Sequence, residues 1–199
     1  MDKDLSIHFF DEQFKRQIEA ESLTLNPFEQ VVLPYLKGEV LDFGCGLGLL
    51  SIAAARQDCS VHALDASATA IEHLKKRAAQ ECLALRAQQA DLRNYALQAT
   101  YDAVVSIGLL MFFDCATARR QLASLQDHLR PGGVAAVNVL IEGTTYLDMF
   151  DPGSYCLFER EVLMQAFSGW ESLHLQYQDF DAPHGLRKSF ATLIARKPT

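Results

Sequence analysis

The chain has 199 residues, of which 49% are hydrophobic, and its formal net charge at pH 7 is −7. A domain of this length buries most of its apolar surface, and no uninterrupted apolar run approaches the ~18 residues of a membrane span. Proteins that follow a phosphate backbone cluster their Lys and Arg residues, whereas here they are scattered. We therefore expect neither a nucleic-acid partner nor a membrane partner.

The first element with a clear beginning is a helix that starts after Asn26. Asn is a favourable cap, Pro27 fits the first turn, and Glu29 can reach back to the cap. We expect this helix to run to about Leu36 and to be disturbed at Pro34, because proline lacks the backbone N–H that a helix interior needs.

Apolar runs and apolar stripes then alternate along the chain. Stripes at helical spacing predict helices over residues 68–81 and 117–129. The last two strand candidates, residues 173–178 and 190–195, are joined by a loop too short for a crossover helix, so they should pair antiparallel. The alternation predicts an α/β fold with a doubly wound sheet and helices on both faces. Continuous apolar runs typical of buried parallel strands lie at residues 40–43, 61–64, 103–107 and 134–141, with a further strand predicted at 83–87.

The most informative segment links the first strand to the next helix. It reads Asp42-Phe43-Gly44-Cys45-Gly46-Leu47-Gly48, and the following strand ends in Asp65. Glycines let the backbone turn tightly and lie against a ligand with no Cβ in between. An acid about 20 residues farther on can hold both hydroxyls of a ribose. The pattern predicts a cofactor that contains adenosine.

The glycine spacing discriminates among such cofactors. A dinucleotide fingerprint, Gly-x-Gly-x-x-Gly, would have its third glycine at position 49, which is Leu49; here the glycine is Gly48. Asp42 beside the turn would repel a pyrophosphate but suits a cationic ammonium group. A nicotinamide-dependent reductase stays an alternative, weakened by Leu49 and by the lack of any Tyr-x-x-x-Lys pair.

The sequence Asp-x-Gly-x-Gly-x-Gly with its downstream acid resembles motif I of the class I S-adenosylmethionine-dependent methyltransferases. Further segments resemble that family in chain order. Asp91 and Leu92 follow the third strand, where the family has an acid that contacts the adenine amino group. Residues 101–106 resemble its fourth strand, and residues 129–133 resemble the helix stop and turn before its fifth.

This resemblance covers residues 38–142 and returns at residues 190–197, which resemble the closing strand of the family. Residues 109–113 and 190–192 are most similar to the small tellurite-resistance-type methyltransferases. The resemblance implies a Rossmann-like sheet of seven strands, mostly parallel with one antiparallel C-terminal strand. It implies a single methyltransferase domain over residues 1–199, divided into a helical arm (1–36), a cofactor-binding core (37–142) and an acceptor-side insertion with the C-terminal strand pair (143–199).

The resemblance also implies a cofactor, S-adenosyl-L-methionine, whose product is S-adenosyl-L-homocysteine. Asp65 would hold the ribose and Asp91 the adenine, and Arg16 in the helical arm would pair with the carboxylate of the donor. No compact acidic cluster indicates a metal ion. The residues expected to bind the cofactor are Asp42, Gly44, Cys45, Gly46, Gly48, Asp65, Ala66, Asp91, Leu92, Ser106, Ile107 and Arg16.

The sequence says less about the methyl acceptor. Methyl transfer from a sulfonium is an in-line displacement, to which a protein contributes mainly alignment and exclusion of water. We expect a small-molecule acceptor, because neither the Asn/Asp-Pro-Pro-aromatic motif of exocyclic-amine methylation nor the Pro-Cys pair of cytosine methylation occurs. Residues 111–113 are either core or an apolar lining of the acceptor pocket. The catalytic residue is unknown, with Glu142, Tyr146 and His184 as candidates.

The five cysteines, at positions 45, 59, 82, 115 and 156, lack the spacing of a zinc site or a redox pair. Their odd number argues against a disulfide set, as does the position of Cys45 and Cys59 beside a predicted buried helix. Residues 1–4 are polar and lack the basic and apolar segments of a secretory signal. These features predict a cytoplasmic protein, monomeric or homodimeric, without disulfides.

The N-terminal residues 1–22 carry Phe9, Phe10 and Phe14 among charged residues. A doubly wound sheet does not need them to close its core. We expect them to form a lid over the bound donor; the alternative is a plug over an apolar patch of the outer helices. A scaffold that binds the donor without catalysing transfer also stays open.

Overall fold

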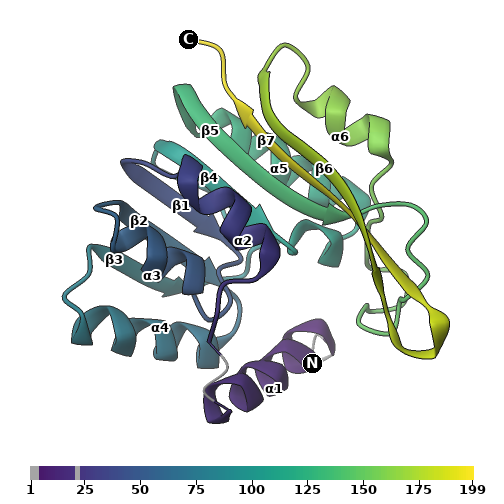
Figure 1. The fold of residues 1–199 in the computed structure, drawn as a ribbon, viewed down its shortest axis with the longest axis horizontal. Helices are drawn as coiled ribbons and strands as arrows, with labels where there is room; N and C mark the ends of the chain where they lie inside the picture. Colours follow the sequence, from purple (N-terminus) through teal and green to yellow (C-terminus); the bar gives the residue numbers. More distant parts are fainter. Residues whose placement is uncertain (1–4, 21–22) are drawn as a thin grey trace.

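The computed structural model describes residues 5–20 and 23–199, and a seven-stranded sheet is its centre (Figure 1). The strand order is β3-β2-β1-β4-β5-β7-β6, in which β7 is antiparallel to both of its neighbours and the other pairs are parallel. The expected doubly wound α/β sheet with one antiparallel C-terminal strand is confirmed. The strands are β1 (Glu39–Phe43), β2 (Ser60–Asp65), β3 (Leu85–Gln89), β4 (Tyr101–Ile107), β5 (Leu129–Leu140), β6 (Glu171–Asp181) and β7 (Arg187–Arg196).

Helices cover both faces of the sheet, and each face has its own apolar core. Val40 and Val105 on one face pack with Leu50, Ile71 and other residues of α2, α3 and α4. The opposite face packs against α5 and α6. Successive residues of each central strand point to opposite faces of the sheet, and both faces are buried, as the continuous apolar runs predict. The helices are α1 (Leu5–Glu19), α2 (Pro27–Val32), α3 (Leu49–Ala55), α4 (Ala68–Gln80), α5 (Cys115–Asp127) and α6 (Arg160–Ala166), with short 3-10 turns η1 (Leu33–Tyr35), η2 (Leu110–Phe112) and η3 (Pro183–Gly185).

The helix predicted after Asn26 forms as expected. The Asn26 side chain accepts hydrogen bonds from the backbone N–H groups of Phe28 and Glu29, and the Glu29 carboxylate accepts from the Asn26 N–H at 2.7 Å. The α-helix ends at Val32 and continues as the 3-10 turn η1, which contains Pro34. The disturbance predicted at this proline is therefore confirmed.

Several predicted boundaries differ from the structure by a few residues, and for two of them the structure shows why. The third strand begins at Leu85 and not at residue 83, because Cys82 has a positive φ of 51° and Leu83 N still bonds to Ala78 O of the preceding helix. Polar residues continue β3 to Gln89, which an edge strand tolerates. The turn predicted at residues 129–133 is instead the irregular start of β5, whose register against β4 shifts between Tyr101 and Ala103.

The expectation of no disulfide is also wrong. Cys115, at the start of α5, is bonded to Cys156, and the backbone N–H of Cys156 donates to Met111 O at 3.0 Å. The two cysteines are 41 residues apart in sequence, so no local spacing reveals the pair. The fold brings the segment after β4 against the segment after β5, and the bond fixes them there. Cys45 and Cys59 are free and buried, and Cys82 is free and exposed.

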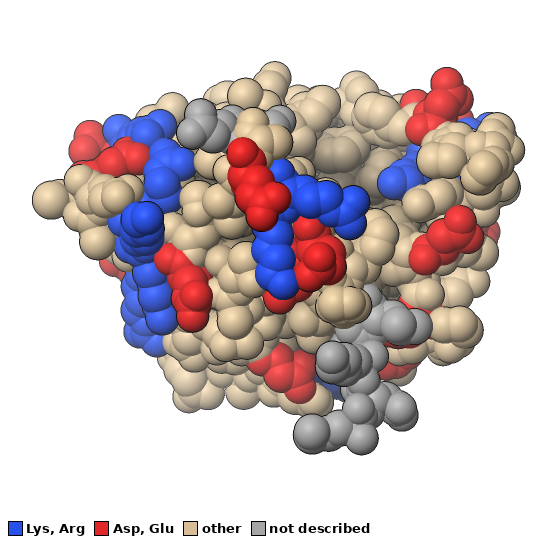
Figure 2. Space-filling view, turned by 90° about the horizontal axis from the view of Figure 1, so that it is seen from below, with Lys and Arg blue, Asp and Glu red and all other residues tan. Residues whose placement is uncertain are grey.

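Helix α1 lies apart from both helical layers, across the edge at which the parallel strands end (Figure 1). The face of the molecule shown in Figure 2 carries Lys and Arg interleaved with Asp and Glu. In the described part of the chain, no helix is both long and apolar enough to cross a membrane. The edge beneath α1 is where the ligands of open α/β sheets bind.

Candidate functional site

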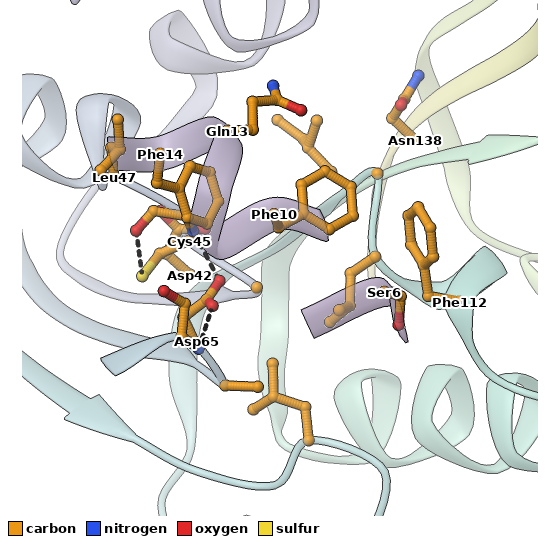
Figure 3. A pocket seen from close by; sticks show the side chains of 18 of the residues that line it. Ser6, Phe10, Gln13, Phe14, Asp42, Cys45, Leu47, Asp65, Phe112 and Asn138 are labelled. Atoms are coloured by element: carbon orange, nitrogen blue, oxygen red, sulfur yellow. Dashed lines mark hydrogen bonds between the residues drawn. The ribbon is translucent and has the colours of Figure 1, made fainter. Parts of the chain in front are cut away.

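A cavity of about 470 Å³ opens at the carboxyl ends of the strands. Its lining comes from α1, the β1–α3 turn, the end of β2, η2, and the ends of β5 and β7. Figure 3 shows Asp42 and Asp65 at one side with Phe14 of α1 next to them, Phe10 of α1 in the middle, and Asn138 at the opposite side. We call the side with the two aspartates the donor end and the side with Asn138 the far end.

The glycine turn at the donor end is held by the neighbouring strand. The backbone N–H groups of Gly44 and Cys45 both donate to Leu64 O, at 2.8 and 2.9 Å. A Cβ at Gly44 would lie 2.8 Å from Leu109, and one at Gly48 would lie 2.5 Å from Leu74, so these two glycines are required by packing. Gly46 differs because its added Cβ would meet Phe14 of α1 at 3.2 Å, on the cavity side.

Asp65 lies at the tip of β2 and fixes two backbone groups. Its Oδ2 accepts from Gly46 N at 2.8 Å, and its Oδ1 accepts from Ser67 N at 2.8 Å (Figure 3). Burial raises the pKa of the Asp65 carboxyl, and these two hydrogen bonds oppose that rise. Each carboxylate oxygen has a further lone pair, so Asp65 can still accept two hydrogen bonds from a ligand in the cavity.

Asp42 is 5% exposed at the end of β1 and also lines the cavity. Ser51 Oγ donates to its Oδ2 at 2.6 Å. The pKa of Asp42 is raised to about 7: burial raises it most, the nearby charges of Glu29 and Asp65 add to the rise, and the hydrogen bond from Ser51 opposes it. A buried carboxyl of this kind becomes a stable anion when a cation enters the cavity beside it.

Most of the remaining expected donor residues line the same cavity. Ala66, Asp91, Leu92 and Ile107 are among its lining residues. Asp91 accepts hydrogen bonds from Arg93 N and Asn94 Nδ2, which hold its loop. Ser106 is buried and does not line the cavity, and its hydroxyl has no partner among the described residues.

Besides Ser106, four expected residues lie outside the cavity lining. The Nε of Arg16 donates to Glu12 O of its own helix at 3.3 Å. Glu142 is exposed, and His184 is exposed in the hairpin turn with a positive φ of 61°. Tyr146 packs beside an apolar cluster, with the Lys188 ammonium 4.6 Å from its ring centroid. The structure thus places none of the three catalytic candidates in the cavity lining.

Helix α1 is fixed over the cavity by polar and apolar contacts. Asp11 accepts hydrogen bonds from the hydroxyls of Ser67 and Thr69 at the start of α4. The ring centroids of Phe10 and Phe112 are 5.0 Å apart in an edge-on pair. The phenylalanines of α1 therefore face the cavity and not the outer helices, although residues 1–4 and 21–22 of the predicted arm lie outside the described residues.

The far end contains residues that the sequence analysis did not single out. Residues 111–113, which were expected to be either core or pocket lining, are both: they line the cavity and are buried in apolar clusters. Asn138 is a polar residue within the apolar run 134–141, which is a signal that could have marked it. The other far-end residues carry no such signal, because they lie in separate segments: Phe28, Met149, Lys188 and Phe190. Glu29 also lines the cavity, near Asp42. Across the described residues, no three His, Cys, Asp or Glu side chains gather as metal ligands would.

Comparisons with known proteins agree with this geometry. Residues 40–133 match the family described as a methyltransferase domain. The chain is 28% identical over 166 residues to hemagglutinin 1 of Eikenella corrodens, covering 80% of this chain and 55% of that protein. It is 26% identical over 166 residues to a probable S-adenosyl-L-methionine-dependent methyltransferase, TehB, of Haemophilus influenzae, covering 80% of this chain and 57% of that protein. The chain thus spans little more than half the length of these relatives.

Among solved structures, that of TehB from Haemophilus influenzae superimposes with a TM-score of 0.77 at 20% identity. The match covers 91% of this chain and 65% of that one, and at this identity it shows the shared fold. The matched family segment contains the glycine turn, Asp65 and Asp91, which are the residues that the resemblance singled out. Residues 40–133 therefore match a methyltransferase domain, and the chain resembles the class I S-adenosylmethionine-dependent methyltransferases of the TehB subgroup.

Proposed function

We propose that the chain transfers a methyl group from S-adenosyl-L-methionine to a small-molecule acceptor by in-line displacement. The observation that carries the proposal is one cavity with the glycine turn and Asp65 at one end and a second, partly apolar end beside it. One cavity with two ends suits a reaction in which donor and acceptor must meet in line.

The residues at the donor end fit this cofactor. Asp65 retains lone pairs for the two ribose hydroxyls, and Asp42 is a buried acid suited to an ammonium group. Gly46 leaves room that a Cβ would fill, so the backbone can lie against a ligand. The donor, when bound, supplies a methyl group already activated by a sulfonium. The proposed binding residues are Asp42, Gly44, Cys45, Gly46, Gly48, Asp65, Ala66, Asp91, Leu92 and Ile107.

The chain's own contribution to the reaction would be alignment and exclusion of water. Phe10 and Phe14 of α1 lie over the donor end, and Phe112 of η2 packs against Phe10. Apolar side chains around the reacting atoms keep water from competing with the acceptor. We propose that α1 acts as the lid of this site, and that the chain divides into the arm (1–36), the core (37–142) and the acceptor-side part (143–199).

Compartment and assembly belong to the proposal as well. The cysteine pattern of the sequence predicts a cytoplasmic location. The Cys115–Cys156 disulfide argues against that location, because disulfides are rare in reducing compartments. Rapid alkylation of thiols in lysed cells, followed by mass spectrometry, tests the compartment: alkylated Cys115 and Cys156 support a cytoplasmic location, and a protected pair contradicts it. A monomer or homodimer that binds neither nucleic acid nor membrane completes the proposal.

An acceptor screen with methyl-labelled S-adenosyl-L-methionine tests the function. We expect label in at least one small molecule, together with calorimetric binding of S-adenosyl-L-homocysteine and no binding of NADH. Binding of S-adenosyl-L-homocysteine with no labelled product from any acceptor would favour a non-catalytic scaffold. Binding of NADH alone would contradict the proposal.

A further inference from the structure

The far end of the cavity holds a buried amide with one atom that has no hydrogen-bond partner among the described residues. Asn138, on β5, is 1% exposed and lines the cavity. Its Nδ2 donates to Thr192 Oγ1 at 2.9 Å, while its Oδ1 has no partner among the described residues. Exchanging the amide oxygen and nitrogen leaves one amide atom free in either orientation, because the Thr192 hydroxyl can donate or accept. A buried unpaired amide is costly unless a ligand completes its hydrogen bonds.

The same end holds a lysine whose charge is not neutralised by a protein carboxylate. Lys188, on β7, lines the cavity, and its Nζ lies 4.6 Å from the centroid of the Tyr146 ring. No carboxylate of the described residues forms an ion pair with it. Burial lowers the pKa of Lys188, which reflects partial loss of water around its ammonium group. An anionic ligand would restore the lost interaction.

The spacing of these two groups limits the size of what can join them. Asn138 is opposite Thr192 in the sheet, and Lys188 is on the same face of β7 four residues before Thr192. Four strand residues span about 13 Å, and the lysine side chain covers part of that distance. The wall beside them is aromatic, with the ring centroids of Phe28 and Phe190 5.0 Å apart. A single ring or a short chain fits between the two polar groups.

We propose that the far end binds small carboxylates as methyl acceptors, with Lys188 on the carboxylate and the free amide atom of Asn138 on a second polar group. Phe28 and Phe190 would pack against the body of the molecule. The proposal rests on the methyl transfer proposed above, since it names the acceptor class for the same cavity. Its test therefore measures binding at each end separately.

The test for Lys188 uses benzoate and benzamide, which differ chiefly in charge, titrated into protein saturated with S-adenosyl-L-homocysteine. We expect the wild type to bind benzoate at least about tenfold more tightly than benzamide. Lys188→Met should remove that preference, and Lys188→Arg should keep most of it. Lys76→Met, an exposed lysine on α4, is the matched control and should change nothing.

Equal binding of the two probes by the wild type, or a preference that survives in Lys188→Met, would overturn the role of Lys188.

The test for Asn138 compares benzoate with the three isomeric hydroxybenzoates. At least one isomer should bind about tenfold more tightly than benzoate, and Asn138→Leu and Asn138→Ala should both lose this gain while keeping the preference over benzamide.

No gain for any isomer, or a gain that persists in both Asn138 variants, would overturn the role of Asn138. Affinity for S-adenosyl-L-homocysteine, measured on the same samples, separates the two proposals. If it is intact and the probes show no preference, the acceptor class is wrong. If it is absent in the wild type, the proposed function itself fails.

Discussion

The donor end and the far end of the cavity are built in different ways. Most of the donor end comes from one stretch of chain, residues 42–67, where hydrogen bonds from backbone N–H groups join the β1–α3 turn to β2 and to Asp65 at its tip. Asp91, Leu92, Ile107 and the phenylalanines of α1 complete it. The far end is assembled from distant segments around positions 28, 138, 149 and 188. A site within one short stretch can be inherited as a motif, whereas a site assembled across the fold can vary one residue at a time. The difference is expected if many acceptors share one donor.

The largest expected effect is at the donor end. Asp65→Ala removes the carboxylate that we propose for both ribose hydroxyls, so affinity for S-adenosyl-L-homocysteine should fall by about 2–4 kcal/mol, measured by calorimetry. Asp179→Ala, in the C-terminal hairpin and paired only with Arg187 at 3.6 Å, is the control and should bind normally. Unchanged affinity in a folded Asp65→Ala variant would contradict the assignment.

Loss of the Cys115–Cys156 disulfide should lower the stability of the fold but leave the donor end of the cavity intact. Replacing both Cys115 and Cys156 with Ser should lower the free energy of unfolding by about 2–3 kcal/mol, because the bond closes a loop of 41 residues. Denaturant titration measures this loss. Affinity for S-adenosyl-L-homocysteine should stay close to that of the wild type, since the bond joins η2 and α5 to the segment after β5. A large loss of donor affinity would mean that the two ends are not independent.

Gly46 tests whether the turn faces the ligand. Gly46→Val should lower donor affinity more than about tenfold, because its side chain would meet Phe14 and enter the cavity at a φ of 52°. Gly153→Val is the matched control: its φ is 77°, yet no atom lies within 4 Å of its added Cβ. Equal losses in the two variants would attribute the effect to backbone strain and not to the cavity.

The smallest expected effect is a pH dependence from Asp42. Its pKa of about 7 means that the carboxyl is protonated below that pH and meets a donor ammonium as an anion above it. Donor affinity should therefore rise with pH up to about 7, by up to about tenfold per pH unit, and level off above it. Glu29 and Asp65 act on the same carboxyl and support its raised pKa. Calorimetry with wild type and Asp42→Asn checks this, and an unaltered profile in the variant would remove Asp42 from the account.

The raised pKa of Asp42 should also make the stability of the ligand-free protein fall as pH rises, whereas donor affinity increases with pH. The folded, ligand-free protein holds the Asp42 proton up to about pH 7, whereas the unfolded chain releases it near the ordinary value for Asp, 3.8. The free energy of unfolding should therefore fall as pH rises through this window. In Asp42→Asn the fall should be smaller, as denaturant titration at several pH values would show.

The contrast between the two ends also explains how much the sequence could predict. The role of Gly44, Gly46, Gly48 and Asp65 could be predicted from the sequence because it depends on their local spacing. The doubly wound sheet could be predicted from the alternation of strand and helix patterns. Asn138 and Lys188 became neighbours of one cavity only through the antiparallel pairing of β5 with β7. Cys115 and Cys156 were brought together in the same way, by the packing of segments that follow different strands. The start of β3 could not be predicted, because it depends on a single residue, Cys82, with a positive φ.

Hydrogen exchange with and without S-adenosyl-L-homocysteine tests the division of the cavity most directly. We predict that the ligand increases protection over residues 44–48 and 65–67 and over residues 8–20 of α1, because the donor fills the space beneath Phe10 and Phe14. Residues 142–158 and 187–190 should change little. Equal protection of α1 in both states would make it a fixed plug and not a lid. Protection confined to the far end would contradict the central claim.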